Sequence, residues 1–149
     1  MQYFVQESFV NTVEKLLKNN SYQDCEKAII ENVFKVSPEN LFALCSALRL
    51  NASPETPIAK LRINFNKGKS SSYRMYVFAL IKNEEIYFAH IYPKTGTKNQ
   101  AALGAKEEKS IIKELLENYK EQLFLEVFLN KENSKICYFL DLFKNIFIS

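Results

Sequence analysis

The hydrophobic pattern of this chain changes from helical to alternating spacing at residues 51–57, and that change limits the folds it can form. Before residues 51–57 apolar side chains recur every three or four positions, as on one face of a helix. After this break Leu61 and Ile63 alternate with Lys60 and Arg62, the period-two pattern of a strand with one buried face. Helices followed by strands in this order predict an α+β fold.

The helical half begins with a segment, residues 1–6, that is suited to a short strand. Ser21 followed three residues later by Asp24 has the spacing of a capping box and predicts the start of a second helix. Ser37 and Pro38 predict a third start, because serine caps helices and proline fits their first position. The expected helices lie around residues 9–17, 22–34 and 38–50.

The second half predicts a small sheet. Residues 73–82 and 86–92 are rich in aromatic and β-branched side chains and flank a polar turn at 83–85, which is typical of an antiparallel hairpin. Helical spacing returns at 106–122, a further strand is expected at 123–129, and 136–143 fits either a strand or a helix. We therefore expect one domain over residues 1–149: an antiparallel or mixed sheet packed against N-terminal helices and a C-terminal helix.

Composition narrows the class of protein. A chain of 149 residues with 47% hydrophobic content is long enough to bury one core. Its apolar runs are far shorter than the roughly 18 residues that span a bilayer, and its first residues lack the pattern of a secretory signal. We expect a cytoplasmic protein without membrane association. Cys25, Cys45 and Cys137 fit neither a disulfide framework nor a metal site, so we expect buried thiols, no metal and no cofactor.

Positive charge is concentrated in one stretch. Residues 56–106 contain nine basic and two acidic side chains, which give this stretch a net charge of about +7. The whole chain has a net charge of +3. The remainder is therefore acidic by about four. A molecule polarised in this way is suited to binding a polyanion.

Strand alternation gathers part of this charge on one surface. Residues two apart share a face of a sheet, and three adjacent strands would bring their sets together. The sets are Lys60, Arg62 and Asn64; Arg74 and Tyr76; and His90, Tyr92 and Lys94. Such a surface suits RNA cleavage without a metal, in which a base deprotonates a ribose 2′-OH, cations hold the phosphate and an acid protonates the leaving oxygen. Tyrosine faces can stack bases, and Lys67, Lys69 and Lys98 in the flanking loops would add substrate-binding or steering charge.

The segments Lys60-Leu61-Arg62, Ser72-Tyr73-Arg74-Met75-Tyr76 and Tyr87-Phe88-Ala89-His90-Ile91-Tyr92-Pro93-Lys94 resemble the RelE/HigB group of type II toxins. The resemblance is clearest from Lys60 to about Tyr119. It implies a compact α+β fold, ribosome-dependent cleavage of mRNA, and a partner antitoxin that covers or distorts the site. It further implies that Lys60 and Arg62 hold phosphate or take the proton, that Arg74 stabilises the transition state, and that Lys94 binds phosphate or acts as the acid. His90 lies where several relatives have a histidine.

The chain departs from that group in three places. It has an additional helical segment near 38–50, a hydrophobic extension over 123–149, and no aromatic residue at 95–100, where Tyr92 could substitute. The extension could add a sheet edge, form a dimer contact or receive the antitoxin, so a homodimer and a hetero-oligomer with the antitoxin both remain open. Two other functions also remain open: inhibition of gyrase, as in the ParE branch, and a non-catalytic interaction domain derived from a toxin.

Overall fold

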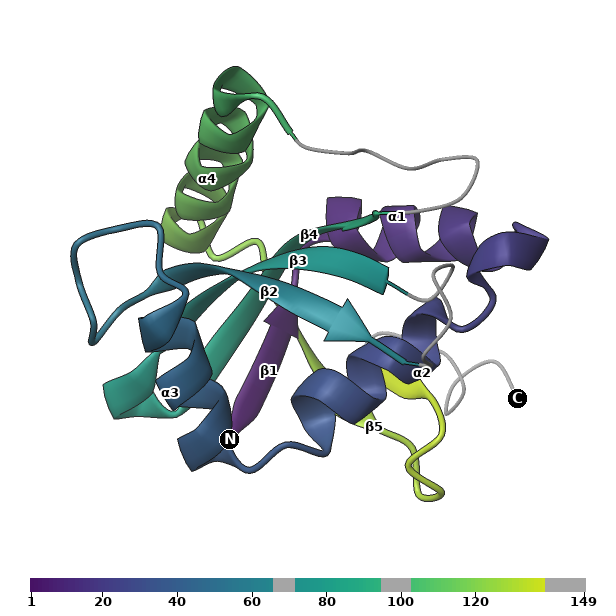
Figure 1. Cartoon of the computed structure of the whole chain (residues 1–149). Coiled ribbons are helices and arrows are strands. Elements are labelled where there is room, and N and C mark those ends of the chain that lie inside the picture. Colours follow the sequence, from purple (N-terminus) through teal and green to yellow (C-terminus); the bar gives the residue numbers. More distant parts are fainter. Residues whose placement is uncertain (66–71, 95–102, 139–149) are drawn as a thin grey trace.

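The structure is a computed structural model that describes residues 1–65, 72–94 and 103–138 (Figure 1). Its elements in chain order are β1 (Gln2–Val5), α1 (Glu7–Leu17), the 3-10 turn η1 (Asn20–Tyr22), α2 (Cys25–Ile29), the π-helical turn η2 (Ile30–Phe34), α3 (Pro38–Ala47), β2 (Ile58–Asn64), β3 (Ser72–Leu80), the 3-10 turn η4 (Ile81–Asn83), β4 (Glu85–Pro93), α4 (Ala105–Lys120), β5 (Leu125–Leu129) and β6 (Ile136–Tyr138). The chain therefore belongs to the α+β class that the sequence predicts.

The six strands form one mixed sheet in the order β2-β3-β4-β1-β5-β6. The β1 strand pairs with β4 in parallel, and every other neighbouring pair is antiparallel. The predicted hairpin is confirmed as β3 and β4, although its turn begins earlier than expected, at Ile81, and ends with Glu84 in the left-handed region at φ 54°. The observed architecture is therefore one mixed sheet, with α1 to α3 between β1 and β2 in the chain and α4 between β4 and β5.

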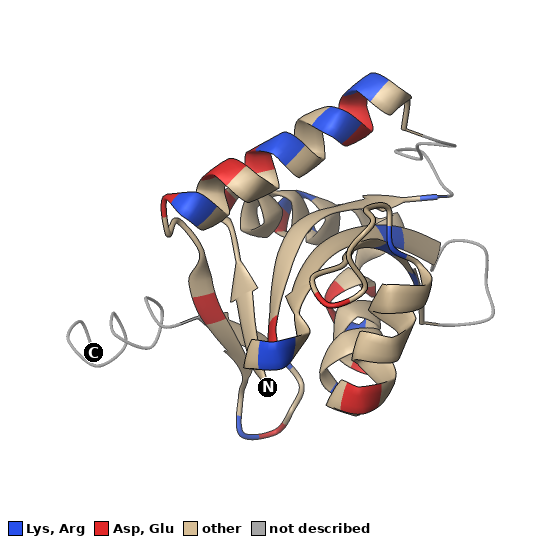
Figure 2. Cartoon of the chain, turned by 90° about the vertical axis from the view of Figure 1, so that its left-hand side faces the viewer, with Lys and Arg blue, Asp and Glu red and all other residues tan. Residues whose placement is uncertain are grey.

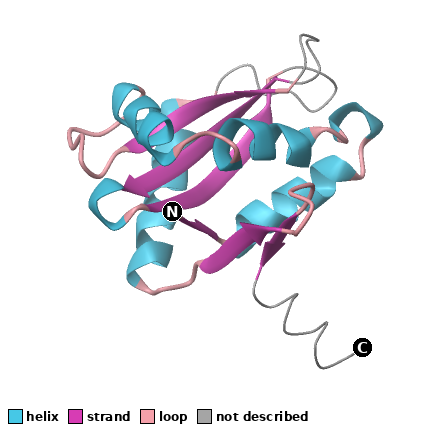
Figure 3. Ribbon diagram, turned by 90° about the horizontal axis from the view of Figure 1, so that it is seen from below, coloured by secondary structure: helices cyan, strands magenta, loops and turns pink. Residues whose placement is uncertain are grey.

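Helices cover both faces of this sheet (Figure 3). On one face, side chains of α1, α2 and α3 pack against Leu61, Met75 and Phe88 in the larger core. On the other face α4 buries Leu115 against a second, aromatic cluster that includes Tyr76 and Tyr87. The two clusters use alternate residues of the same strands, as the pleat requires.

One predicted helix start is correct and another is wrong. Ser37 caps α3, its hydroxyl accepting from the Asn40 N–H at 3.3 Å, and Pro38 is the first residue of that helix. The capping box at Ser21 and Asp24 is not formed, because the side chain of Asn19 caps the preceding turn by accepting from the Ser21 N–H. The Asp24 carboxylate instead accepts a hydrogen bond from the Tyr73 hydroxyl at 2.6 Å, so it fastens the helical layer to the sheet.

The two segments that distinguish this chain also have places in the fold. The segment predicted near 38–50 forms α3, after which the Leu50 N–H donates to the Ile58 carbonyl at 2.7 Å and covers the start of the edge strand β2. In the C-terminal extension, β5 and β6 lengthen the sheet on its other side, and residues 139–149 lie outside the described part. Among the described residues no helix is long and apolar enough to cross a membrane.

Candidate functional site

The sheet register brings the predicted basic residues onto one surface. Lys60 lies opposite Tyr76 and Arg62 lies opposite Arg74 on the β2–β3 pair. The β3–β4 pair continues these rows, and the Lys94 N–H donates to the Ser72 carbonyl at 2.9 Å, which begins a third row. The rows are Lys60–Tyr76–His90, Arg62–Arg74–Tyr92 and Asn64–Ser72–Lys94. Lys67, Lys69 and Lys98 lie outside the described residues, so their proposed role stays a prediction.

Two arginines face each other at the centre of this surface without an acidic partner. Arg62 is exposed and Arg74 is half-buried, and like charges directly opposite each other destabilise a sheet. Burial, and secondarily the neighbouring Arg62, lower the pKa of Arg74. Among the described residues, no carboxylate lies within 4.0 Å of the charged nitrogens of Lys60, Arg62 or Arg74. An anion placed here would relieve the repulsion between the two guanidinium groups.

The Arg74 guanidinium is held toward the third row. One of its nitrogens, Nη1, donates to the Ser72 hydroxyl at 3.2 Å and to the Tyr73 carbonyl at 3.1 Å. A guanidinium has five N–H donors, so these two contacts orient the group and leave donors for a ligand. The guanidinium is therefore oriented by neighbouring residues of its own strand.

The two tyrosines of the surface form a floor and do not offer the open stacking faces that the sequence predicted. Tyr76 is 0% exposed and Tyr92 is 3% exposed. The Lys60 ammonium lies above both rings, 5.7 Å from the centre of Tyr76 and 5.9 Å from the centre of Tyr92. The prediction was wrong because α4 and the Lys60 ammonium cover the rings, and cation–π attraction favours this arrangement over solvent-exposed aromatic faces.

One site residue was missed because it comes from a distant helix. The hydroxyl of Tyr76 donates to Oε2 of Glu108, in the first turn of α4, at 2.6 Å. Burial first, and then this carboxylate, raise the pKa of Tyr76, so the phenol stays protonated at neutral pH. No local pattern in the sequence indicates this partner, because the two residues are 32 positions apart.

A β-bulge places His90 beside the floor. Tyr76 pairs with His90 whereas Val77 pairs with Phe88, so Ala89 is an extra residue in β4. The imidazole of His90 lies 6.4 Å from the ring of Tyr76 and 6.1 Å from the ring of Tyr92, measured between centres. Burial lowers the pKa of His90, and Glu114 opposes this in part. At neutral pH the imidazole is therefore uncharged and able to accept a proton.

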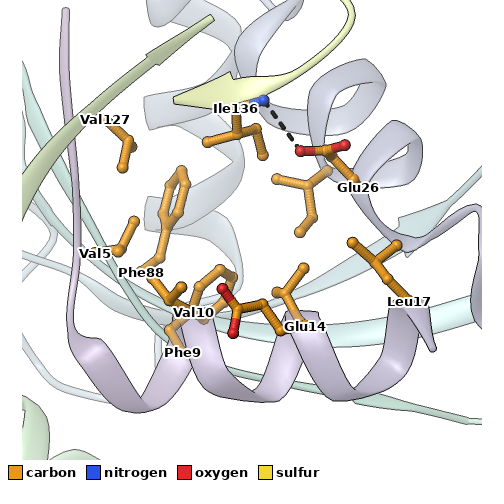
Figure 4. A pocket seen from close by; sticks show the side chains of 11 residues that line it. Val5, Phe9, Val10, Glu14, Leu17, Glu26, Phe88, Val127 and Ile136 are labelled. Atoms are coloured by element: carbon orange, nitrogen blue, oxygen red, sulfur yellow. Dashed lines mark hydrogen bonds between the residues drawn. The ribbon is translucent and has the colours of Figure 1, made fainter. Parts of the chain in front are cut away.

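A separate pocket on the other face has the opposite chemistry. The pocket has a volume of about 190 Å³ and is lined by side chains of α1, α2, β1, β4, β5 and β6 (Figure 4). Its walls are mainly apolar, including Phe9, Phe88 and Val127, and its charged members are Glu14 and Glu26. Glu26 also accepts from the Ile136 N–H at 3.1 Å. With two carboxylates and no basic side chain in its lining, this pocket does not suit an anionic ligand.

Charge on α4 is mixed, with lysines and glutamates following one another along the helix (Figure 2). The local excess of positive charge therefore belongs to β2 and β3, which carry Lys60, Arg62 and Arg74 and no acidic residue, rather than to the helix beside them. No three His, Cys, Asp or Glu side chains of the described part come together as a metal site. Comparisons of the chain with family models, curated proteins and solved structures find no match.

Proposed function

We propose that this protein is the toxin of a type II toxin–antitoxin system and cleaves mRNA on the ribosome without a metal. The observation that carries the proposal is the facing pair Arg62 and Arg74, which lacks a carboxylate partner among the described residues and has Lys60 in the next row. Retaining like charges opposite each other costs stability, so a ligand that binds between them is the physical reason to keep them. The phosphate of an RNA chain supplies that ligand.

The rows also arrange groups for acid–base chemistry. His90 lies two residues before Tyr92 in β4 and Lys94 lies two residues after it, just past the end of the strand, each roughly 7 Å from Tyr92 if the chain stays extended. A phosphate over the central row would therefore have a neutral imidazole on one side and an ammonium on the other. In-line cleavage needs this order, because the attacking 2′-oxygen and the leaving 5′-oxygen lie on opposite sides of phosphorus.

In the proposed reaction these side chains supply both the base and the acid. His90 takes the 2′-OH proton, the 2′-oxygen bonds to phosphorus, and the bond from phosphorus to the 5′-oxygen breaks as Lys94 donates a proton to it. The products are a 2′,3′-cyclic phosphate and a 5′-hydroxyl end. Lys60, Arg62 and Arg74 stabilise the charge that develops on the phosphate oxygens. DNA lacks the 2′-OH and would not be cut.

The same surface accounts for control by an antitoxin. Acidic side chains of a partner could occupy the place of the phosphate between Arg62 and Arg74, and this would block RNA binding and relieve the repulsion together. The partner proposed on this ground is a protein with an exposed acidic segment. Whether the assembly contains one toxin chain or two is a separate question for sedimentation of the complex.

Controlled expression followed by mapping of mRNA 5′ ends tests the function. Wild type should stop growth and produce new 5′ ends, whereas Arg74→Ala should lose both while staying folded. Lys82→Ala is the control, because it removes an exposed positive charge at the hairpin turn, away from the three rows. Unchanged cleavage by Arg74→Ala would refute the site. Intact mRNA with altered DNA supercoiling would indicate the gyrase alternative, and unimpaired growth would indicate a non-catalytic interaction domain.

A further inference from the structure

A recess opens where β4 loses one of its neighbours. The β1 strand pairs with β4 only as far as Val5 opposite Phe88, and the chain then enters α1. Gln6 covers the next position, because its side-chain N–H donates to the Ala89 carbonyl at 2.7 Å. Beyond it lies a cavity of about 240 Å³ between α1, which contributes Thr12, Lys15 and Leu16, and residues 90–93 of β4.

The open strand edge gives this recess a hydrogen-bonding wall. The Lys94 N–H points toward β3, where it donates to the Ser72 carbonyl. Backbone groups alternate in direction along an antiparallel strand, so those of Tyr92 also point toward β3 and those of Ile91 point into the recess. An N–H and a C=O side by side match the edge of a flat ring that carries one acceptor and one donor. The side chains of Leu16 and Ile91 supply apolar surface for its faces.

One further feature suits the recess to a polar ligand. Lys15 is exposed at the rim, where an ammonium can hold an anionic group beside the cavity.

The recess adjoins the basic surface, since His90 and Tyr92 belong to both. Its volume is below the roughly 300 Å³ at which pockets for drug-sized ligands begin, which suits a single ring system. We propose that the recess binds one unpaired nucleobase, on the nucleotide next to the phosphate held by Arg62 and Arg74, and that Lys15 holds the adjoining phosphate. This inference rests on the proposed function and assigns it a base-reading subsite.

Binding of 2′-O-methyl RNA tests the subsite without any cleavage. Fluorescence anisotropy with short single-stranded A, C and U oligomers gives affinity and base preference for the full chain. Thr12→Tyr places a ring in the recess and should weaken binding about tenfold and remove the base preference. Asn11→Tyr is the matched control, because it adds the same ring at an exposed neighbouring position of α1 that does not line the recess.

A second pair of variants does not depend on filling the cavity. Lys15→Ala should weaken binding about threefold and lower the slope of log affinity against log salt by about one, the effect of one lost phosphate contact. Lys18→Ala, an exposed lysine at the end of the same helix and outside the recess, should leave the slope unchanged. Thermal melting confirms that each variant is folded.

The outcomes separate the subsite from the proposed function. Unchanged affinity and base preference in Thr12→Tyr, or an unchanged salt slope in Lys15→Ala, would overturn the subsite. RNA binding with the expected losses, but no mRNA cleavage in a translating extract, would refute the nuclease and leave the subsite standing. No binding of any oligomer by the wild type would overturn the subsite, and mRNA cleavage in the translating extract would then decide the proposed function separately.

Discussion

The opposition of Arg62 and Arg74 predicts that a single neutral substitution makes the free protein more stable and abolishes the proposed mRNA cleavage. Residues directly opposite each other in an antiparallel pair have Cα atoms about 5 Å apart. Two unit charges about 6 Å apart repel by about 0.7 kcal/mol in a water-like dielectric. For a chain of 149 residues this corresponds to a rise in Tm of about 2 °C for Arg62→Gln.

The assay is thermal melting at two salt concentrations. The gain of Arg62→Gln should be present near 0.01 M salt, where the Debye length is about 30 Å, and should vanish near 1 M, where it is about 3 Å. Lys82→Gln removes the same charge beside Glu84 at the hairpin turn and should show no gain. Added inorganic phosphate should then raise the Tm of wild type more than that of Arg62→Gln, because the wild type keeps both arginines around the anion.

Two results would refute this reasoning. A Tm of Arg62→Gln at or below that of wild type in low salt would mean that the facing arginines are not under electrostatic strain. Equal stabilisation of both proteins by phosphate would mean that the anion does not bind between Arg62 and Arg74. Either result would remove the observation on which the proposed function depends.

Three other predictions follow from individual side chains. Tyr76→Phe should destabilise the protein by about 1 kcal/mol in urea unfolding, because Glu108 loses a donor, whereas Tyr92→Phe should cost nothing or stabilise it, because the removed hydroxyl has no partner among the described residues. The pKa of His90 is lower in the folded chain than its ordinary value of 6.5, so the neutral imidazole contributes stability above pH 6.5 that is lost as pH falls through 6.5 toward the lower folded value. Between about pH 7.5 and pH 5 the Tm of His90→Gln should therefore fall less than that of wild type. An equal fall in Tm for both proteins would refute this prediction. Burial raises the pKa of the two buried cysteines to about 12, so a thiol reagent at pH 8 should modify half-buried Cys137 alone in the native protein and all three thiols after unfolding.

Strand alternation explains why much of the basic surface was predictable. The period-two pattern places Lys60 and Arg62 on one face of β2 whatever lies beside it, and the hairpin does the same for Arg74. Their alignment into rows then follows from the register of antiparallel neighbours. The cap of α3 was predictable for a similar reason, because the contact between Ser37 and Asn40 is local in sequence.

The exceptions involve partners that are distant along the chain. Asp24 has the spacing of a capping residue, but Tyr73 competes for its carboxylate from the sheet. Tyr76 and Tyr92 could stack bases only if their face of the sheet were open to solvent. Helix α4 covers that face. The bulge at Ala89 also escapes a period-two reading, because one inserted residue leaves the apolar pattern of β4 nearly unchanged.

By itself, therefore, the sequence determined the α+β class, the approximate positions of the central strands and which cations share a face, because these properties depend on short-range periodicity and on backbone geometry. The tertiary structure decided that Arg62 and Arg74 face each other without an acid among the described residues, that Tyr76 and Tyr92 lie beneath the Lys60 ammonium, and that a recess adjoins His90. These features depend on contacts between residues far apart in the chain. Such contacts are set by how the elements pack, and no local pattern records them.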